Sequence, residues 1–491
     1  MPAYMILVPI LIPILTGAGM LLFPFRDARI RNIFVEIMVV ITTAFCLLLL
    51  TSPPKEALNL FSLGENLVMT LRVDGMAIFF GGIVSCLWPL ATLYTFEYMR
   101  HEERVNTFLA FYTITYGTTL GVAFAGNIFC MYLFYEALTL VTLPLCIHTL
   151  TPQAKSATRK YLYYMIGGTA FAFIGMVFYA LYSLNFDFVY GGSLDLVRIA
   201  THKDVVLLIY VLAFFGFGVK AAVFPFHGWL PSISVAPTPV TALLHAVAVV
   251  KSGIFAIMRL TVYCFGMDYL RGTWAQAVVL IFGMLTIIHA STMGVREPHL
   301  KRRLAYSTVS NLSYMIVGLG TMTPLGFYAA MAHMLFHAVM KISGFFCIGA
   351  VMHQTNKNYI YEIDGLGYRM PITFGALFVS SLSLIGIPLF SGFVSKWMLA
   401  DALFEGGGLL EEVAVWALMY SALMTAIYLL SIAIRAFFPE KGSNWGAMRE
   451  FTDPNLCMTI PLSVFSLVTV FFGVHSGQIL RLLEQISRGV M

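Results

Sequence analysis

The sequence has few charged residues. Only 11% of its 491 residues are Asp, Glu, Lys or Arg, whereas 59% are hydrophobic and the mean hydropathy is +0.85. A soluble globular protein carries about 25% charged residues, because its surface faces water. The deficit excludes a secreted domain, a disordered chain and a nucleic-acid-binding protein, which would need a basic stripe with aromatic residues. It predicts a polytopic membrane protein.

Cysteine pairs at metal-binding spacing are also missing. None of the seven cysteines forms a CxxC pair, and nearly all of them lie within apolar runs. A buried cysteine of this kind behaves as a small hydrophobic side chain. The sequence therefore predicts no disulfide framework, iron–sulfur cluster or zinc site. It also has no phosphate-binding glycine loop and no nucleophile motif, so we expect no cofactor and no catalytic residue of its own.

Long apolar runs are plentiful. About 20 predominantly apolar residues suffice to cross the hydrocarbon core as a helix. By this criterion the sequence predicts an all-α fold of 14 transmembrane helices. The first is expected to be retained, because no basic segment marks it as a signal peptide. The runs are 5–24, 33–51, 76–95, 108–125, 128–147, 161–183, 205–224, 239–265, 275–294, 304–322, 326–352, 372–400, 413–437 and 458–480.

Lysine and arginine are unevenly distributed between alternate loops. With the N-terminus outside, the inner loops hold 17 of them, Lys441 and Arg449 included, and the outer loops with the C-terminus hold seven. The positive-inside rule therefore predicts an outer N-terminus. The longest polar stretches, 53–74, 185–204 and 438–457, are expected to be loops, so residues 1–491 form a single transmembrane domain.

Five basic residues remain within the apolar runs. A charged side chain at the bilayer centre costs roughly 2.5–3.5 kcal/mol on insertion scales, so four lysines would cost on the order of 10 kcal/mol if charged and unpaired. Such residues indicate an ion pathway by default. The fifth, Arg259, lies toward one end of its helix and is expected to extend to the interface. The lysines are Lys220, Lys251, Lys341 and Lys396.

Glu136 is the carboxylate nearest the middle of an apolar run, in NIFCMYLFYEALTLVTLP. It is the expected counter-ion of a buried lysine. The structural alternative is an ion pair that locks two helices together.

Two of the lysines lie beside helix-breaking residues. Glycines and a proline surround Lys220 in VLAFFGFGVKAAVFPFHGWLP, and the same residue types precede Lys396 in SLSLIGIPLFSGFVSKWMLADAL. Broken helices at membrane depth are tolerated where they line a cavity or pack in protein. A pair of them in two halves of a chain is typical of transporters built from inverted repeats. For Lys220 the alternative is a side chain that extends to the inner interface.

Histidines accompany the other two lysines. His333, His337 and Lys341 recur every four residues, so they share one helix face over about 12 Å. Three titratable groups in register favour a proton relay, because histidine titrates near neutrality. A metal site there would lack a carboxylate or cysteine ligand. His245 and Lys251 lie about 120° apart on an ideal helix, so water or a kink must connect them, and His245 alone also fits a packing role.

One long motif, FPFHGWLPSISVAPTPVTALLHAVAVVKSG, resembles a known family, as do LKRRLAYSTVSNLSYM, HMLFHAVMKISGFF and GIPLFSGFVSKW. The family is that of the antiporter-like subunits shared by respiratory complex I, Mrp-type cation/proton antiporters and membrane-bound energy-converting hydrogenases. The resemblance implies two inverted five-helix repeats with interrupted helices 7 and 12. Helices 1–3 would occupy 1–105, the repeats 106–265 and 274–437, and helix 14 residues 458–480.

The resemblance also implies a role for each buried group. The fifth-helix carboxylate, the lysines of helices 7 and 8, the connector on helix 11 and the ionisable residue of helix 12 form a proton pathway in the family. The matching residues here are Glu136, Lys220, His245, Lys251, His333, His337, Lys341 and Lys396.

The implied function is proton translocation within a multisubunit complex of a prokaryotic cytoplasmic (inner) membrane. A redox-driven complex is expected, whose peripheral iron–sulfur, flavin or hydrogenase subunits would supply the energy. Two alternatives stay open. The chain is also similar to the D-type subunit of Mrp Na⁺/H⁺ antiporters, and a membrane scaffold with merely paired buried charges would carry the same residues. Whether the chain serves an oxidoreductase is left open by the sequence.

Overall fold

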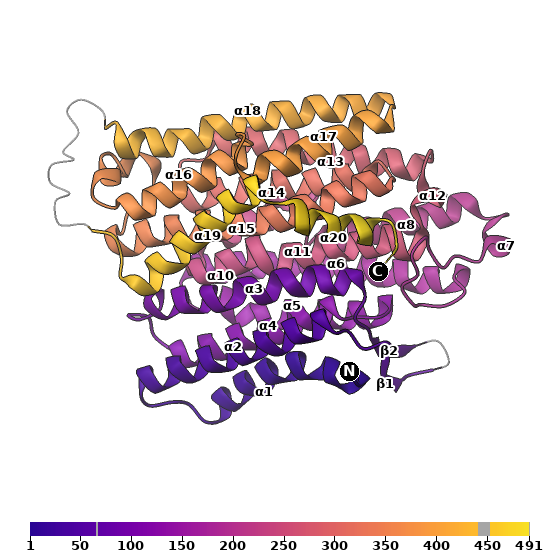
Figure 1. Ribbon diagram of the computed structural model, residues 1–491, viewed down its shortest axis with the longest axis horizontal. Coiled ribbons are helices and arrows are strands. Elements are labelled where there is room, and N and C mark those ends of the chain that lie inside the picture. Colours follow the sequence, from indigo (N-terminus) through magenta and orange to yellow (C-terminus); the bar gives the residue numbers. More distant parts are fainter. Residues whose placement is uncertain (65–66, 440–451, 491) are drawn as a thin grey trace.

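The computed structural model describes residues 1–64, 67–439 and 452–490, so Lys441 and Arg449 of the orientation argument lie outside the described residues. Most of the described chain is helical, and the long helices run side by side (Figure 1). The first helices form one edge of the molecule and α18 lies at the opposite edge, with α11 and α15 between them. The interior is therefore built from the middle of the chain.

The N-terminal part consists of five long helices and a strand pair. Asp27 and Asp74 begin α2 and α3, because their carboxylates accept the free amides of the first turn. The elements are η1 (Ala3–Leu7), α1 (Val8–Leu22), α2 (Ala28–Thr51), β1 (Leu58–Ser62), β2 (Val68–Leu71), α3 (Gly75–Tyr98), α4 (Val105–Ala123) and α5 (Ile128–Cys146).

The middle of the chain alternates long helices with short and irregular turns. Its elements are α6 (Pro152–Tyr182), α7 (Leu196–Ile199), α8 (Lys203–Gly218), η2 (Phe226–Gly228), α9 (Trp229–Ser232), η3 (Ile233–Val235), α10 (Thr238–Ala242), η4 (Leu243–Val247), α11 (Val249–Met258), η5 (Arg259–Phe265) and α12 (Met267–Leu270). Both η4 and η5 are π-helical, and the window of highest hydropathy within Thr238–Phe265 is 100% buried.

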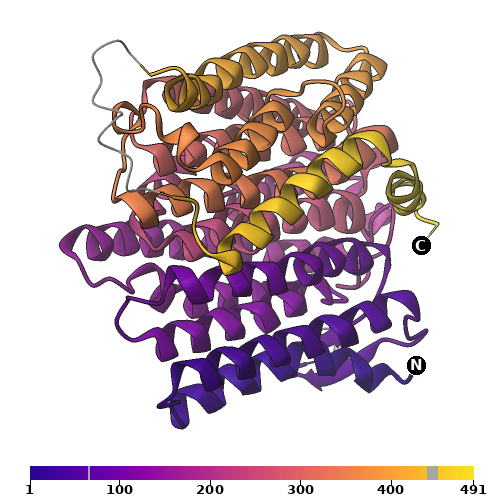
Figure 2. The same cartoon turned by 60° about the vertical axis from the view of Figure 1, so that its left-hand side comes forward.

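The C-terminal part returns to long helices. Its elements are α13 (Trp274–Arg296), α14 (Leu300–Gly320), α15 (Pro324–Thr355), η6 (Ile360–Glu362), η7 (Leu366–Tyr368), α16 (Pro371–Ile385), α17 (Ser391–Gly406), α18 (Leu409–Phe437), α19 (Leu456–Val474) and α20 (Gly477–Ser487). In Figure 2, α20 is seen nearly end-on beside the C-terminus, so its axis runs across the direction of the neighbouring helices.

Ten helices of the described chain are long and apolar enough to cross a membrane. The other four predicted spans coincide with α4, α8, α14 and the pair α16 and α17, which are shorter or less apolar. The all-α multi-pass prediction is therefore confirmed, while the count of 14 stays a prediction.

Four predicted segments differ from the structure. The loop 53–74 contains an antiparallel pair of strands, in which Leu58 pairs with Leu71 and Asn59 with Thr70. The run 205–224 ends its helix at Gly218, and the run 372–400 divides between α16 and α17. The last run, 458–480, divides at His475 because an amphipathic helix, α20, follows α19.

The prediction for Arg259 is wrong. Its side chain is 0% exposed and forms two hydrogen bonds with Asp74, of 2.6 and 2.7 Å, instead of reaching the interface. Three aromatic rings surround the guanidinium, those of Phe188, Phe255 and Tyr263. The pair fastens the helical segment that carries Lys251 to the start of α3.

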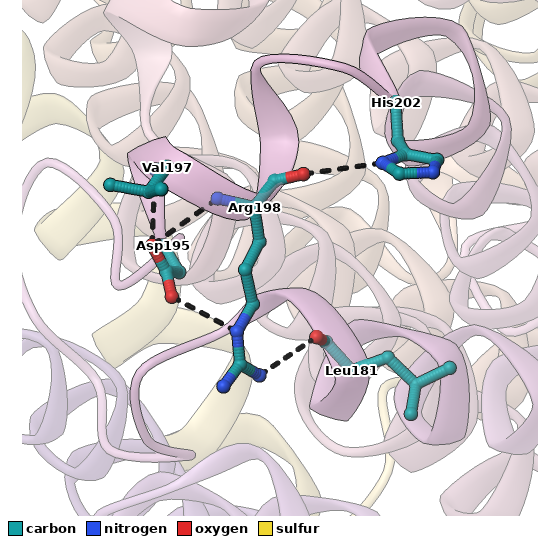
Figure 3. A network of polar contacts seen from close by, with 5 residues as sticks. All are labelled: Leu181, Asp195, Val197, Arg198 and His202. Carbon is teal, nitrogen blue, oxygen red and sulfur yellow. Dashed lines mark hydrogen bonds and ion pairs between the residues drawn. The ribbon is translucent and has the colours of Figure 1, made fainter.

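A second arginine pair lies in the connection between α6 and α8 and contrasts with the first (Figure 3). Asp195 accepts the amides of Val197 and Arg198 and pairs with the Arg198 guanidinium at 3.2 Å. Arg198 also donates to the Leu181 carbonyl, and its own carbonyl contacts His202. Since the Arg198 side chain is 62% exposed, water screens this pair.

We expect Arg259→Ala to destabilise the protein by roughly 3–5 kcal/mol, because it leaves the Asp74 carboxylate buried without its partner. Arg198→Ala should lower the free energy of unfolding by at most about 1 kcal/mol, because an exposed ion pair contributes no more than that to stability. Thermal unfolding of the two purified variants in the same detergent measures the difference. Equal midpoints would contradict the structural role of the buried pair.

Candidate functional site

The interruption predicted around Lys220 is present in the structure. Helix α8 ends at Gly218, and an irregular segment leads to η2. The carbonyl freed at Val219 accepts a hydrogen bond of 2.9 Å from the Trp229 indole, and the Phe224 amide donates to Thr286 on α13 at 2.9 Å. The break is therefore tolerated because side chains bind the backbone groups that it frees.

Lys220 is 1% exposed and directed at α5. Its ammonium donates to the Tyr135 carbonyl and lies 3.3 Å from the centre of the Tyr135 ring. Glu136, the next residue of α5, interacts with Lys220 electrostatically, but no ion pair within 4 Å joins them in the described structure. The buried oxygen Oε1 of Glu136 has no hydrogen-bond partner. The two groups are thus close enough to attract each other without being locked together.

Lys251 and His337 come from different helices and meet in the interior. The Lys251 ammonium lies 2.5 Å from Nδ1 of His337, and both residues are 0% exposed. His245 is equally buried and its ring packs on Phe345 at 4.7 Å, but among the described residues neither of its ring nitrogens has a hydrogen-bond partner. The π-turns η4 and η5 flank Lys251, so the ideal-helix angle between His245 and Lys251 does not apply. Such turns occur often at functional sites.

The face of α15 that carries His333, His337 and Lys341 is buried throughout. The rings of His333 and His337 lie 5.8 Å apart. Lys341 instead donates to the Leu304 carbonyl of α14 at 3.1 Å, and no side-chain partner is present for it among the described residues. The three residues therefore lie on one buried face of α15, as the spacing predicts, but each contacts a different partner.

Lys396 lies at the second interruption, as the sequence predicts. Its half-buried ammonium donates to the Leu384 and Ile385 carbonyls at 2.6 and 3.0 Å, which are left free where α16 ends. It also lies 5.1 Å from the centre of the Tyr314 ring. Lys220 and Lys396 thus each contact a backbone carbonyl and a tyrosine ring, but only the carbonyls at Lys396 are freed by the interruption itself.

Two further residues contact the ring nitrogens of His333, Ser395 at the second interruption and Asn311 on α14, and neither was identified from the sequence. Ser395 lies 2.9 Å from Nδ1 of His333, and Asn311 lies 3.2 Å from Nε2. Ser395 directly precedes Lys396, and this position beside a predicted pathway lysine could have identified it as a site residue. Asn311 lies mid-helix in α14, where only its polarity in an apolar run marks it.

A polar cavity of about 710 Å³ lies at one end of the bundle, between α6, η3 and α14. Lys160, Glu297 and Arg302 supply its charges. The nearby rings of His227 and His289 are 4.6 Å apart, although His289 stands alone in the sequence. Within the described residues, no three His, Cys, Asp or Glu side chains come together as metal ligands.

The sequence matches the profile "NADH:quinone oxidoreductase/Mrp antiporter, TM" over residues 125–427, which is more than half of the chain. The chain belongs to this family. It is an antiporter-like, multi-pass membrane subunit of the kind found in Mrp antiporters and complex I-like complexes.

Curated relatives of the family come from both kinds of complex. They include the A-type subunit of the Na⁺/H⁺ antiporter of Alkalihalophilus pseudofirmus, with 32% identity over 84% of this chain and 53% of that protein. NADH-quinone oxidoreductase subunit N of Desulforudis audaxviator is 30% identical over 85% and 83%. F420H2 dehydrogenase subunit L of Methanosarcina mazei is 29% identical over 92% and 70%. The chain thus spans about half the length of the antiporter protein.

Two solved structures share the fold. A chain of the Mrp complex from Dietzia sp. superposes with a TM-score of 0.85 at 19% identity, covering 99% of this chain and 97% of that one. A chain of the archaeal membrane-bound sulfane sulfur reductase gives 0.83 at 22%, with 99% and 97% covered. The family therefore joins respiratory and antiporter complexes in one architecture.

The contact between His333 and Ser395 can be tested directly. We expect Ser395→Ala to slow ion transport about tenfold, because it leaves a buried ring nitrogen without a partner. Ser466→Ala is the matched control, since Ser466 bonds only to the Leu462 carbonyl of its own helix. Transport is measured in proteoliposomes that contain equal amounts of folded complex. Equal rates in the two variants would show that the contact is dispensable.

Proposed function

We propose that this chain is a proton-translocating subunit of a multisubunit membrane complex. The observation that carries the proposal is the buried series Lys251, His337, His333 and Ser395, whose last member directly precedes the lysine of the second interruption. All four residues are 0% exposed. A purely structural ion-pair network would require carboxylates, whereas this series consists of groups that can pass a proton between them.

Proton transfer would begin at the first interruption. When Glu136 approaches Lys220, the attraction favours the protonated lysine; when they separate, the buried ammonium loses that support and releases its proton toward Lys251. Oε1 of Glu136, which has no hydrogen-bond partner among the described residues, supports such movement. From Lys251 the proton would pass through His337 and His333 to Lys396. His245 and Lys341 lie beside this series and would adjust its charge.

The finer topology belongs to the same proposal. We propose fourteen transmembrane helices and an outer N-terminus in a bacterial or archaeal cytoplasmic membrane. We also propose inverted repeats at 106–265 and 274–437, which would place the two interruptions in equivalent positions. Lys220 and Lys396 each contact a backbone carbonyl and a tyrosine ring, and this likeness supports the repeat.

Energy would come from partner subunits. A redox-driven complex is one source, and respiratory relatives such as F420H2 dehydrogenase subunit L support it. A Mrp-type exchange of Na⁺ for H⁺ is the second, supported equally by the relative from a Na⁺/H⁺ antiporter. Both use the same internal pathway, so they differ only in what drives it.

We expect Lys220→Ala to abolish transport while leaving the complex assembled, because it removes the first proton carrier but adds no buried charge. Lys155→Ala, at an exposed position at the start of α6, is the control and should transport normally. Native gels measure assembly and a pH-sensitive dye measures transport. Normal pumping in Lys220→Ala would overturn the pathway. Wild-type transport in every Lys→Met variant of the four buried lysines would support a scaffold instead.

The energy source is tested with vesicles that contain the purified complex. Mass spectrometry of the complex first identifies its partners, and iron–sulfur, flavin or hydrogenase subunits are expected for a redox-driven pump. Electron-donor-dependent acidification would then support that source. A Na⁺-dependent pH change without any donor would support exchange, and Lys220→Ala should eliminate whichever signal is present.

A further inference from the structure

An apolar cavity of about 570 Å³ lies on the opposite side of α15 from the proton series. It is enclosed by α2, α3, α15, α19 and α20, and almost all of its lining is hydrocarbon. Leu335 and Val339 of α15 line it, alternating with His333 and His337 along the same helix. Leu47 of α2 is 39% exposed, so the cavity opens toward the surroundings of the bundle.

A second cavity of about 270 Å³ adjoins the first, and polar side chains form part of its lining. The two share Phe472, Ile479 and Leu482, so they lie side by side. The second adds His475 and Gln478, from the junction between α19 and α20. A ligand that occupies both would place an apolar part between the helices and a polar part at this junction.

Helix α20 supplies the setting of a membrane interface. Ile479, Leu482, Leu483 and Ile486 lie on its apolar side, while Gln478 and Arg481 belong to its polar side. An amphipathic helix of this kind lies in the plane of the headgroups. Arg481 is exposed and bonds only weakly to the Gly477 carbonyl, at 3.4 Å, so its charge is available to an anion.

We propose that these two cavities bind one anionic phospholipid, with an acyl chain in the apolar cavity and the phosphate near His475, Gln478 and Arg481. An acyl chain is thin enough to enter between these helices and matches the hydrocarbon lining, and the polar groups at the open end suit its headgroup. The proposal is independent of the proton pathway.

Gly82 provides a specific way to fill the cavity. A Cβ built at Gly82 meets only Leu50 within 4 Å, at 3.8 Å, so a larger side chain would extend into the space. Gly375 of α16 is the matched control, because a Cβ there meets nothing within 4 Å and it does not line the cavity. Val464→Phe fills the same cavity from α19 and serves if Gly82→Leu fails to assemble.

The test uses the whole complex in phosphatidylcholine nanodiscs with a trace of phosphatidylglycerol that carries a diazirine on one acyl chain. Illumination should label α3, α15 and α19. Gly82→Leu should lower this labelling about tenfold, the loss expected when roughly two methylene groups lose their apolar contacts. Gly375→Leu should label like the wild type. Arg481→Gln should reduce labelling by phosphatidylglycerol toward that by a diazirine phosphatidylcholine.

Three results would overturn the proposal. Equal labelling of the cavity helices in the wild type and in both cavity-filling variants would show that lipid does not enter. Equal labelling of the wild type by the two lipids would show that the site does not select an anionic headgroup. Cross-links from these helices to another subunit, in place of lipid adducts, would assign the cavity to a protein partner.

Discussion

The free energy of holding ammonium groups at membrane depth is the constraint on which the rest of this structure depends. Each of the four lysines meets it through its own contacts: Lys220 with the Tyr135 carbonyl of α5, Lys396 with carbonyls freed where α16 ends, Lys251 with a histidine, and Lys341 with a carbonyl of α14. None of these partners carries a full negative charge. The lysines are therefore solvated well enough to remain buried but are not fixed in the charged state, as a proton carrier requires.

The interruptions themselves depend on close backbone approach. A Cβ at Gly253 of α11 would lie 2.6 Å from the Ala221 amide nitrogen, beside Lys220. A Cβ at Gly392 would overlap the Ser383 carbonyl oxygen, where α17 begins against α16. A Cβ at either place would clash with backbone, so glycine permits this close packing. The carbonyls freed where α16 ends face Lys396 rather than lipid, which is the condition for non-helical backbone at this depth.

Local sequence was sufficient to predict the helices, both interruptions and the buried ionisable residues, because apolar runs, breakers and charges are local features. It failed where partners come from distant segments. Arg259 reaches Asp74, 185 residues away, so position within its own helix gave the wrong environment. Asn311 and Ser395 meet only through His333. Lys301 is one of the 17 basic residues assigned to the inner loops from the sequence, yet it is 4% exposed and donates a hydrogen bond to the Ala236 carbonyl.

The two halves of the proposed pathway differ in continuity, and this difference determines where transfer is controlled. Lys251 lies within hydrogen-bond distance of His337, and His333 within that of Ser395, while the two histidine rings are 5.8 Å apart. Small shifts of these buried side chains would let a proton move along this half. Between Lys220 and Lys251 no side-chain contact is present in the described structure, and Glu136 is the acidic group that interacts with Lys220. A driving subunit would therefore act most effectively on α5 and the broken segment after α8. Moving Glu136 there changes the charge state of Lys220 without disturbing the connected series beyond it.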